Sequence, residues 1–193
     1  MTPPFLLLKE NFISEDLCKG FIDFFDANPQ YHVKGQSGDG VYPEHLDDTE
    51  ISLNFNYNYI DVVKELIPYI NNITREYKEI NPLLNELASW KLDDFFQMSK
   101  YEPGEVYNGL HCEHGPMNIG QSNRVIAWMI YLNDVHDGGG THFPQYEYTT
   151  KARTGSIALW PAGWTHMHRG QVSNTEKKYI LTGWYDYEVR GTI

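Results

Sequence analysis

The spacing of apolar residues divides the chain into a helical first half and a strand-rich second half. Between residues 14 and 29, apolar side chains recur at helical spacing behind Ser14, a favourable N-cap, and the helix should end before Pro29. Residues 61–77 repeat the same period, which predicts a second amphipathic helix, kinked or interrupted at Pro68. This second helix should pack against a sheet.

From Phe95 onward, short segments rich in β-branched and aromatic residues alternate with turns. The seven segments are 95–101, the one around His111, 125–133, 141–146, 156–161, 164–172 and 177–185. So many short strands predict a sandwich or barrel, and helices followed by strands predict a segregated α+β architecture within one domain.

Residues 34–50 are rich in glycine, aspartate and other turn formers, which predicts a mobile loop. Such a loop is either a lid over a substrate or only a long connection.

The net charge of the chain limits the classes of binding partner. Its 193 residues include 15 Lys and Arg against 26 Asp and Glu, a formal net charge of −11. Phosphate backbones and anionic membranes are repelled on average, so we expect no nucleic acid and no membrane partner. A basic protein or peptide is more compatible, although the charge could equally serve solubility.

The cysteines and the N-terminus bear on the compartment. Cys18 and Cys112 are the only cysteines, and their positions suggest no disulfide framework, which fits a reducing cytoplasm. The apolar run within residues 1–9 is too short for a signal peptide or a membrane span and lacks a basic flank. We therefore expect a cytoplasmic protein.

A candidate metal site begins at His111-Cys-Glu113. Side chains alternate along a strand, so His111 and Glu113 would share one face while Cys112 points away. A second histidine could come from His166 or His168, which alternation places on one strand face without choosing between them. Two imidazoles and one carboxylate leave coordination positions open, which suits Fe(II), whereas zinc favours a closed tetrahedron.

A basic residue accompanies this candidate site. On the last predicted strand, Lys178, Ile180, Thr182 and Trp184 share one face. A lysine on an inward apolar face is costly to bury unless an anion meets it. In the alternative, Lys178 forms an ordinary solvated pair with Lys177.

Together these residues resemble the prolyl-4-hydroxylase-like 2-oxoglutarate- and Fe(II)-dependent oxygenases, which include the hypoxia-type prolyl hydroxylases and microbial and viral relatives. The resemblance covers about residues 95–187 and rests on motifs that occur in the family's order. They are Tyr101-Glu-Pro-Gly104, His111-x-Glu113, the strand from Arg124 to Asn133 ending in Y-L-N, Gly138-Gly-Gly-Thr-His-Phe143, and Pro161-Ala-Gly163.

The resemblance implies a role for each candidate residue. The family's basic residue follows its distal histidine by nine or ten positions, and Lys178 lies ten positions after His168 but twelve after His166. Fe(II) is therefore assigned to the catalytic triad His111, Glu113 and His168, while 2-oxoglutarate is assigned to Tyr101, Tyr131, Lys178 and Thr182. The residues assigned to the substrate or its entrance are Arg124, Trp184 and His166. Most relatives carry Asp where this chain has Glu113.

The implied fold is a double-stranded β-helix, a jelly-roll of two facing sheets with the N-terminal helices outside the larger one. Residues 1–94 would form helical support and a lid region, and residues 95–187 the catalytic core. The implied reaction uses Fe(II), 2-oxoglutarate and O₂, with ascorbate as an optional reductant, and hydroxylates a prolyl residue of a protein or peptide at C4.

Two alternatives remain open. The enzyme could act on another residue or on a free amino acid, or the chain could be a cupin-like binding module without catalysis. Such a module would not need Lys178, Tyr101 and Tyr131 to converge on one anion.

Overall fold

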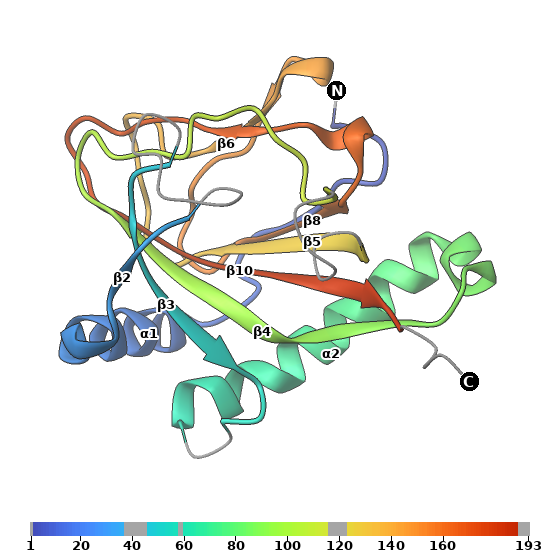
Figure 1. Ribbon diagram of the computed structural model, residues 1–193, viewed down its shortest axis with the longest axis horizontal. Helices are drawn as coiled ribbons and strands as arrows, with labels where there is room; N and C mark the ends of the chain where they lie inside the picture. Colours follow the sequence, from blue (N-terminus) through green and yellow to red (C-terminus); the bar gives the residue numbers. More distant parts are fainter. Residues whose placement is uncertain (1, 37–45, 58–59, 116–122, 189–193) are drawn as a thin grey trace.

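The computed structural model describes residues 2–36, 46–57, 60–115 and 123–188, which form two facing antiparallel sheets (Figure 1). Within these residues the larger sheet has the strand order β1-β8-β5-β10-β4-β3-β2, and the smaller one the order β7-β6-β9. The strands are β1 Leu7–Lys9, β2 Val33–Lys34, β3 Thr49–Asn54, β4 Trp90–Tyr101, β5 Arg124–Tyr131, β6 Thr141–Phe143, β7 Tyr148–Thr149, β8 Ile157–Pro161, β9 Arg169–Gly170 and β10 Lys178–Tyr187. This arrangement confirms the predicted jelly-roll of α+β class.

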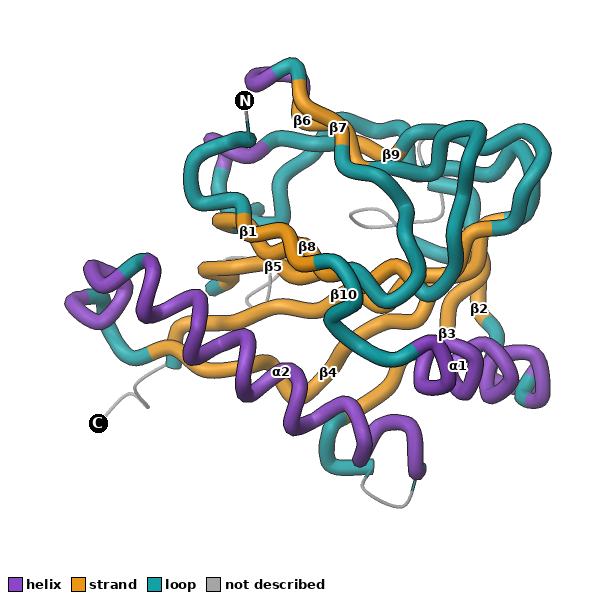
Figure 2. The backbone as a smooth tube through the Cα atoms, turned by 180° about the vertical axis from the view of Figure 1, so that it is seen from behind, coloured by secondary structure: helices purple, strands orange, loops and turns teal. Residues whose placement is uncertain are grey.

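Two helices cover the outer face of the larger sheet (Figure 2). Helix α1 spans Glu15–Ala27, and the Ser14 hydroxyl accepts the Leu17 N–H at 3.1 Å, as the N-cap prediction required. Helix α2 spans Asp61–Ile80 and passes through Pro68, so the predicted interruption is absent. A proline removes one helical hydrogen bond, and the burial of α2's apolar face against the sheet offsets that loss.

The main core lies between these helices and the larger sheet. It contains Phe21 and Phe25 of α1, Leu66 and Ile70 of α2, and Trp128 of β5, all fully buried. Smaller apolar clusters lie between the two sheets. The larger sheet therefore uses its outer face for stability, and its inner face can carry polar groups.

Three local predictions need correction. Lys34 and residues 49–50 of the predicted 34–50 loop belong to strands β2 and β3, and residues 37–45 lie outside the described residues. The many turn-forming residues favoured a loop over the strand that the alternation of Glu50 and Ser52 with Ile51 and Leu53 indicates. The predicted strand 164–172 is instead a 3₁₀ turn, Trp164–His166, followed by β9. His111 lies in an isolated bridge to His168 and not in a regular strand.

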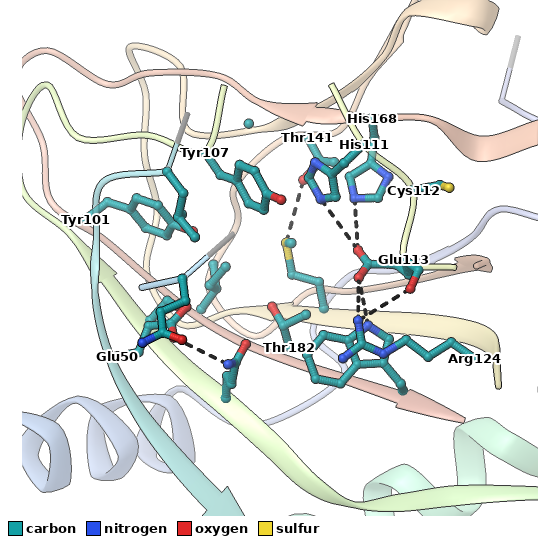
Figure 3. A pocket seen from close by; sticks show the side chains of 18 of the residues that line it. Glu50, Tyr101, Tyr107, His111, Cys112, Glu113, Arg124, Thr141, His168 and Thr182 are labelled. Carbon is teal, nitrogen blue, oxygen red and sulfur yellow. Dashed lines mark hydrogen bonds and ion pairs between the residues drawn. The ribbon is translucent and has the colours of Figure 1, made fainter. Parts of the chain in front are cut away.

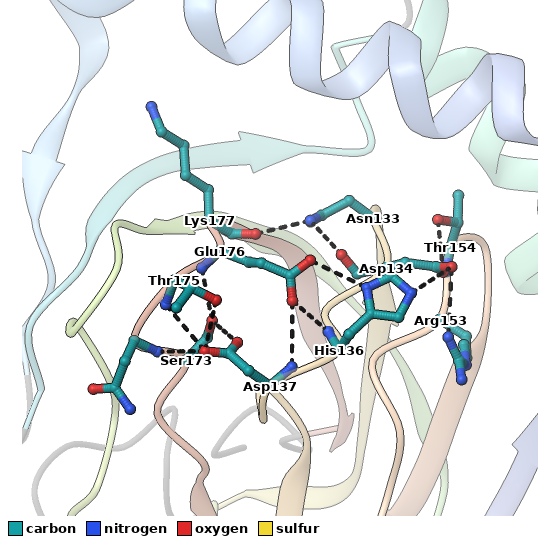
Figure 4. Close-up of polar contacts among 11 residues, drawn as sticks. Asn133, Asp134, His136, Asp137, Arg153, Thr154, Ser173, Thr175, Glu176 and Lys177 are labelled. Atoms are coloured by element: carbon teal, nitrogen blue, oxygen red, sulfur yellow. Dashed lines mark hydrogen bonds and ion pairs between the residues drawn. The ribbon is translucent and has the colours of Figure 1, made fainter.

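A polar network holds the loop before β6 against the loop before β10 (Figure 4). The Asp137 carboxylate accepts hydrogen bonds from the Ser173 and Thr175 hydroxyls and from the Asn174 N–H. Nearby, Glu176 accepts the backbone N–H of His136 at 2.6 Å. These contacts fix the chain just before β10 and so determine where Lys178 enters the interior.

No helix in the described part of the chain has the length and apolar character needed to cross a membrane.

Candidate metal centre

Three potential metal ligands meet between the two sheets. One nitrogen of His111, one nitrogen of His168 and one carboxylate oxygen of Glu113 all lie within 4.8 Å of one another. A pair of backbone hydrogen bonds brings the two histidines together. The His111 N–H donates to the His168 carbonyl at 3.0 Å, and the His168 N–H donates to the His111 carbonyl at 2.8 Å. Cys112 is outside the group, and its Sγ donates to the His114 carbonyl.

Backbone carbonyls orient both imidazoles. The Nδ1 of His111 lies 2.8 Å from the Gly109 carbonyl, and the Nδ1 of His168 lies 2.9 Å from the His166 carbonyl. A carbonyl can only accept, so each Nδ1 carries the proton and each Nε2 presents a lone pair. The two Nε2 atoms lie 3.8 Å and 3.1 Å from Glu113 Oε1. This tautomer is the one that a metal ion requires.

The other carboxylate oxygen of Glu113 contacts Trp184 and Arg124 on the side away from the histidines. Its Oε2 accepts the Trp184 indole N–H at 2.8 Å and lies 3.5 Å from Arg124 Nη1. The Arg124 guanidinium stacks 3.5 Å from the centre of the Trp184 ring. Burial alone would raise the pKa of Glu113, but His168, His111 and Arg124 outweigh it and hold that pKa well below its usual range. The carboxylate is therefore ionised and its arm is fixed.

Aromatic rings enclose the two imidazoles. Tyr107 stacks on His111 with ring centroids 3.9 Å apart and planes 8° from parallel, while Trp160 meets the His168 ring edge-on at 5.0 Å. Burial, with a smaller contribution from the neighbouring His168, lowers the pKa of His111 to about 4. His111 is therefore neutral near pH 7. Sequence reasoning missed Tyr107, because the segment that joins it to His111 is irregular and has no periodic pattern to assign its side chain to the site.

These groups line one side of a cavity of about 310 Å³. Figure 3 shows Tyr101 and Glu50 on the side of this pocket away from Glu113. Side chains of the larger sheet form the floor, and they include Lys178, Ile180, Thr182 and Trp184 of β10. The inward face predicted for that strand is confirmed.

Lys178 is a buried cation in this cavity. It is 6% exposed, and its Nζ lies 4.1 Å from the centre of the Tyr101 ring. Burial lowers the pKa of Lys178 to about 8, opposed by the charge of Asp48. Lys177, by contrast, is exposed and lies 3.2 Å from Glu102. The alternative of a solvated lysine pair is therefore wrong.

Two predicted site residues do not line the cavity. The Tyr131 hydroxyl is buried between the hydroxyls of Thr141 and Thr150, at 2.8 Å and 2.7 Å, and only Thr141 reaches the cavity. His166 belongs to the 3₁₀ turn, where its Nε2 lies 2.8 Å from the Pro4 carbonyl. The predicted common face of His166 and His168 is wrong because the chain is not a strand there.

Sequence reasoning also missed an acidic pair on β3 and the loop before it. Asp48 and Glu50 are both buried, and the Gln97 amide donates to Glu50 Oε2 at 3.3 Å. Glu50 lines the cavity. The alternation of Glu50 and Ser52 against Ile51 and Leu53 could have revealed this strand.

Comparisons with known proteins agree with this geometry. Residues 96–186 match the family model of the 2OG-Fe(II) oxygenase superfamily. No curated protein matches the sequence. A viral collagen prolyl hydroxylase from Paramecium Bursaria Chlorella virus-1, solved with 2OG, has a TM-score of 0.70 at 17% identity, covering 95% of this chain and 97% of that one.

Two further solved structures are similar. A prolyl-4-hydroxylase from Pseudomonas putida gives a TM-score of 0.73 at 14% identity over 94% of this chain and 92% of that one. A prolyl hydroxylase from Trichoplax adhaerens, solved with a hypoxia inducible factor peptide fragment, gives 0.70 at 15% identity over 94% and 83%. At these identities the likeness establishes the shared fold. Together with the family match, it confirms the resemblance predicted from the motifs.

Proposed function

We propose that this 2OG-Fe(II) oxygenase hydroxylates a prolyl residue of a peptide or protein at C4, with Fe(II) bound by His111, Glu113 and His168. One observation carries the proposal. A group of two histidines and one carboxylate and a buried cation, Lys178, line the same cavity.

The three ligands suit Fe(II) in donor type and orientation. Both imidazoles present Nε2, Glu113 presents an ionised oxygen, and the cavity extends beyond them. Members of this family use Fe(II), 2-oxoglutarate and O₂. Bound Fe(II) would supply the oxidative decarboxylation of 2-oxoglutarate to succinate and CO₂ that drives hydroxylation. Arg124 and Trp184, predicted to contact substrate, would fix the Glu113 arm as well.

Lys178 would anchor the far carboxylate of 2-oxoglutarate. A buried ammonium without an ion pair among the described residues is costly, and an incoming carboxylate would remove that cost. The Tyr101 ring lies beside this ammonium, and Thr182 lines the same floor. The Tyr131 hydroxyl would act through Thr141, which it contacts and which reaches the cavity.

A peptide substrate is supported by the similar enzymes. The Trichoplax structure holds a peptide fragment, and the viral enzyme is named a collagen prolyl hydroxylase. On β4 Gln97 lines the cavity, and Phe95, two residues earlier on the same strand, is 53% exposed, so strand alternation would continue the floor toward the surface. A peptide can follow such a floor, whereas a free amino acid does not need one.

The division into support and catalytic core is also part of the proposal, with one amendment. Residues 95–187 would carry the ligands, but β3 in the first part adds Glu50 to the cavity. The cytoplasmic location stays a prediction, based on Cys18 and Cys112, which form no disulfide.

Peptide turnover tests the proposal. Proline-containing peptides should release succinate in step with hydroxylated product, and product analysis should place the hydroxyl on C4 of the prolyl ring. The matched control replaces that proline by alanine. Succinate release that is equal with both peptides, and no hydroxyproline, would refute prolyl hydroxylation.

A further inference from the structure

One wall of the cavity remains unused by the proposed metal and cosubstrate sites. Glu50 lines this wall on β3, is 9% exposed, and accepts the Gln97 amide at 3.3 Å. Figure 3 shows Glu50 beneath Tyr101, well away from Glu113. Its carboxylate is close to fully buried and meets the cavity directly.

A second carboxylate stands behind Glu50. Asp48 is fully buried, and among the described residues neither of its oxygens has a partner at ordinary hydrogen-bond geometry. Burial raises its pKa, and the Ser99 and Tyr101 hydroxyls and the Glu50 carboxyl still lie close enough to oppose that rise. The backbone of Gly35 closes over it, because a Cβ at that glycine would lie 1.9 Å from Asp48 Oδ1. Burying one acid without a partner is costly, and burying two side by side is more costly still.

Among the described residues, no cation of the cavity forms an ion pair with Glu50. Arg124 is engaged by Glu113 and Trp184, and Lys178 faces Asp48 and the proposed cosubstrate site. Burial, followed by the charge of Asp48, raises the pKa of Glu50 to about 8, and of the groups acting on it only the Ser99 hydroxyl opposes this. A ligand that brings a positive charge would favour the ionised form of Glu50 and pair with it, whereas a neutral amide would not.

We propose that Glu50, held by Gln97 and backed by Asp48, binds a cationic nitrogen of the substrate. The source is a lysine or arginine side chain near the hydroxylated residue, or an α-ammonium group. This inference rests on the proposed oxygenase function and adds a specificity: the substrate is basic at the active site. The net charge of −11 favours the approach of such a substrate.

Matched peptides test the proposal on the full chain loaded with Fe(II) and 2-oxoglutarate under anaerobic conditions. Lysine is placed at successive positions on either side of the prolyl residue and compared with neutral norleucine, and arginine is compared with neutral citrulline. A charge-assisted hydrogen bond predicts at least about tenfold tighter binding of the cationic member at one position. Peptides with free and acetylated N-termini assign any gain to the side chain or to the α-ammonium.

Variants assign the preference to its residue. Glu50→Gln keeps the shape of the side chain and should lose the preference, to within about twofold. Glu65→Gln, on the exposed face of α2, is the control and should keep it. A preference retained in Glu50→Gln, or absent from every matched pair with wild-type protein, would overturn the proposal.

Proton release gives a second readout. Asp48 and Tyr101 are the titratable groups that interact with Glu50, and Lys178 in turn interacts with Asp48. The raised pKa of Glu50 keeps it protonated near pH 7. Pairing with a cation lowers that pKa, so binding should release a proton in wild-type protein and none in Glu50→Gln. Calorimetry in two buffers of different ionisation enthalpy measures this.

The two proposals fail differently. If the wild-type protein does not bind 2-oxoglutarate, the oxygenase function is refuted. Normal 2-oxoglutarate binding with no charge preference would refute only the role of Glu50. A melting curve of Glu50→Gln that matches wild type excludes misfolding as the cause of a lost preference.

Discussion

Replacing Lys178 by methionine should weaken 2-oxoglutarate binding without destabilising the fold. Methionine keeps the apolar stem beside the Tyr101 ring and removes only the ammonium. Loss of a charge-assisted hydrogen bond in a secluded pocket costs roughly 1.5–3 kcal/mol, which corresponds to about 10- to 150-fold in affinity.

The same substitution should leave the fold intact or make it more stable. Burial moves the pKa of Lys178 from 10.5 to about 8, a difference worth roughly 3 kcal/mol against the charged form. An apolar side chain does not carry that cost. We therefore expect a melting temperature equal to or above that of wild type, so that weaker binding cannot be attributed to unfolding.

The assay is an anaerobic titration of 2-oxoglutarate into the Fe(II) protein, followed by the metal-to-ligand absorption band. Lys177→Met is the matched control, because Lys177 is exposed and pairs with Glu102 at the surface. The control should bind as wild type does. An unchanged affinity in Lys178→Met would refute the anchor and remove the main reason for placing this cosubstrate in the cavity.

Four further predictions follow from the same contacts. His168→Ala should lose Fe(II), whereas His166→Ala should retain it, because the His166 ring faces the Pro4 carbonyl; metal analysis of the two purified variants checks this, and the reverse pattern would reassign the ligand. Glu113→Gln should lose more than about 90% of turnover because an amide supplies no anionic oxygen, while Glu113→Asp stays active; succinate assays compare them, and full activity of the Gln variant would exclude Glu113 as a ligand. Affinity for 2-oxoglutarate should fall as the pH rises through about 8, since the lowered pKa makes Lys178 lose its charge there; titrations across that range measure it, and Lys178→Met should show no such decline. Ser14→Ala should lower the free energy of unfolding by about 1 kcal/mol through loss of the α1 N-cap, as denaturant titration would reveal.

Much of the candidate site could be predicted from short-range patterns in the sequence. The i, i+2 spacing of His111 and Glu113 and the alternation along β10 both depend on neighbouring residues only, and the structure brings these side chains to one cavity. The helices were predictable for the same reason, since Ser14 and the apolar period are local signals.

Other features depend on contacts that local patterns do not encode. The Tyr131 hydroxyl is held by Thr141 and Thr150, which reach it only when β5 and the smaller sheet meet. The acids Asp48 and Glu50 follow a glycine-rich stretch that predicted a loop, and only the pairing of β3 with β4 brings Glu50 to the cavity. His166 and His168 do not share a face, because His166 ends a 3₁₀ turn where the sequence predicted a strand.

The origin of the product's oxygen tests the central claim most directly. Wild-type protein is given Fe(II), 2-oxoglutarate, a proline-containing peptide and isotopically heavy O₂, and the peptide is then analysed by mass spectrometry. We predict one heavy oxygen on C4 of the prolyl residue and one succinate for each hydroxylation. A peptide that gains no oxygen, or gains it only from water, would contradict the assignment of this cavity to a prolyl-hydroxylating oxygenase.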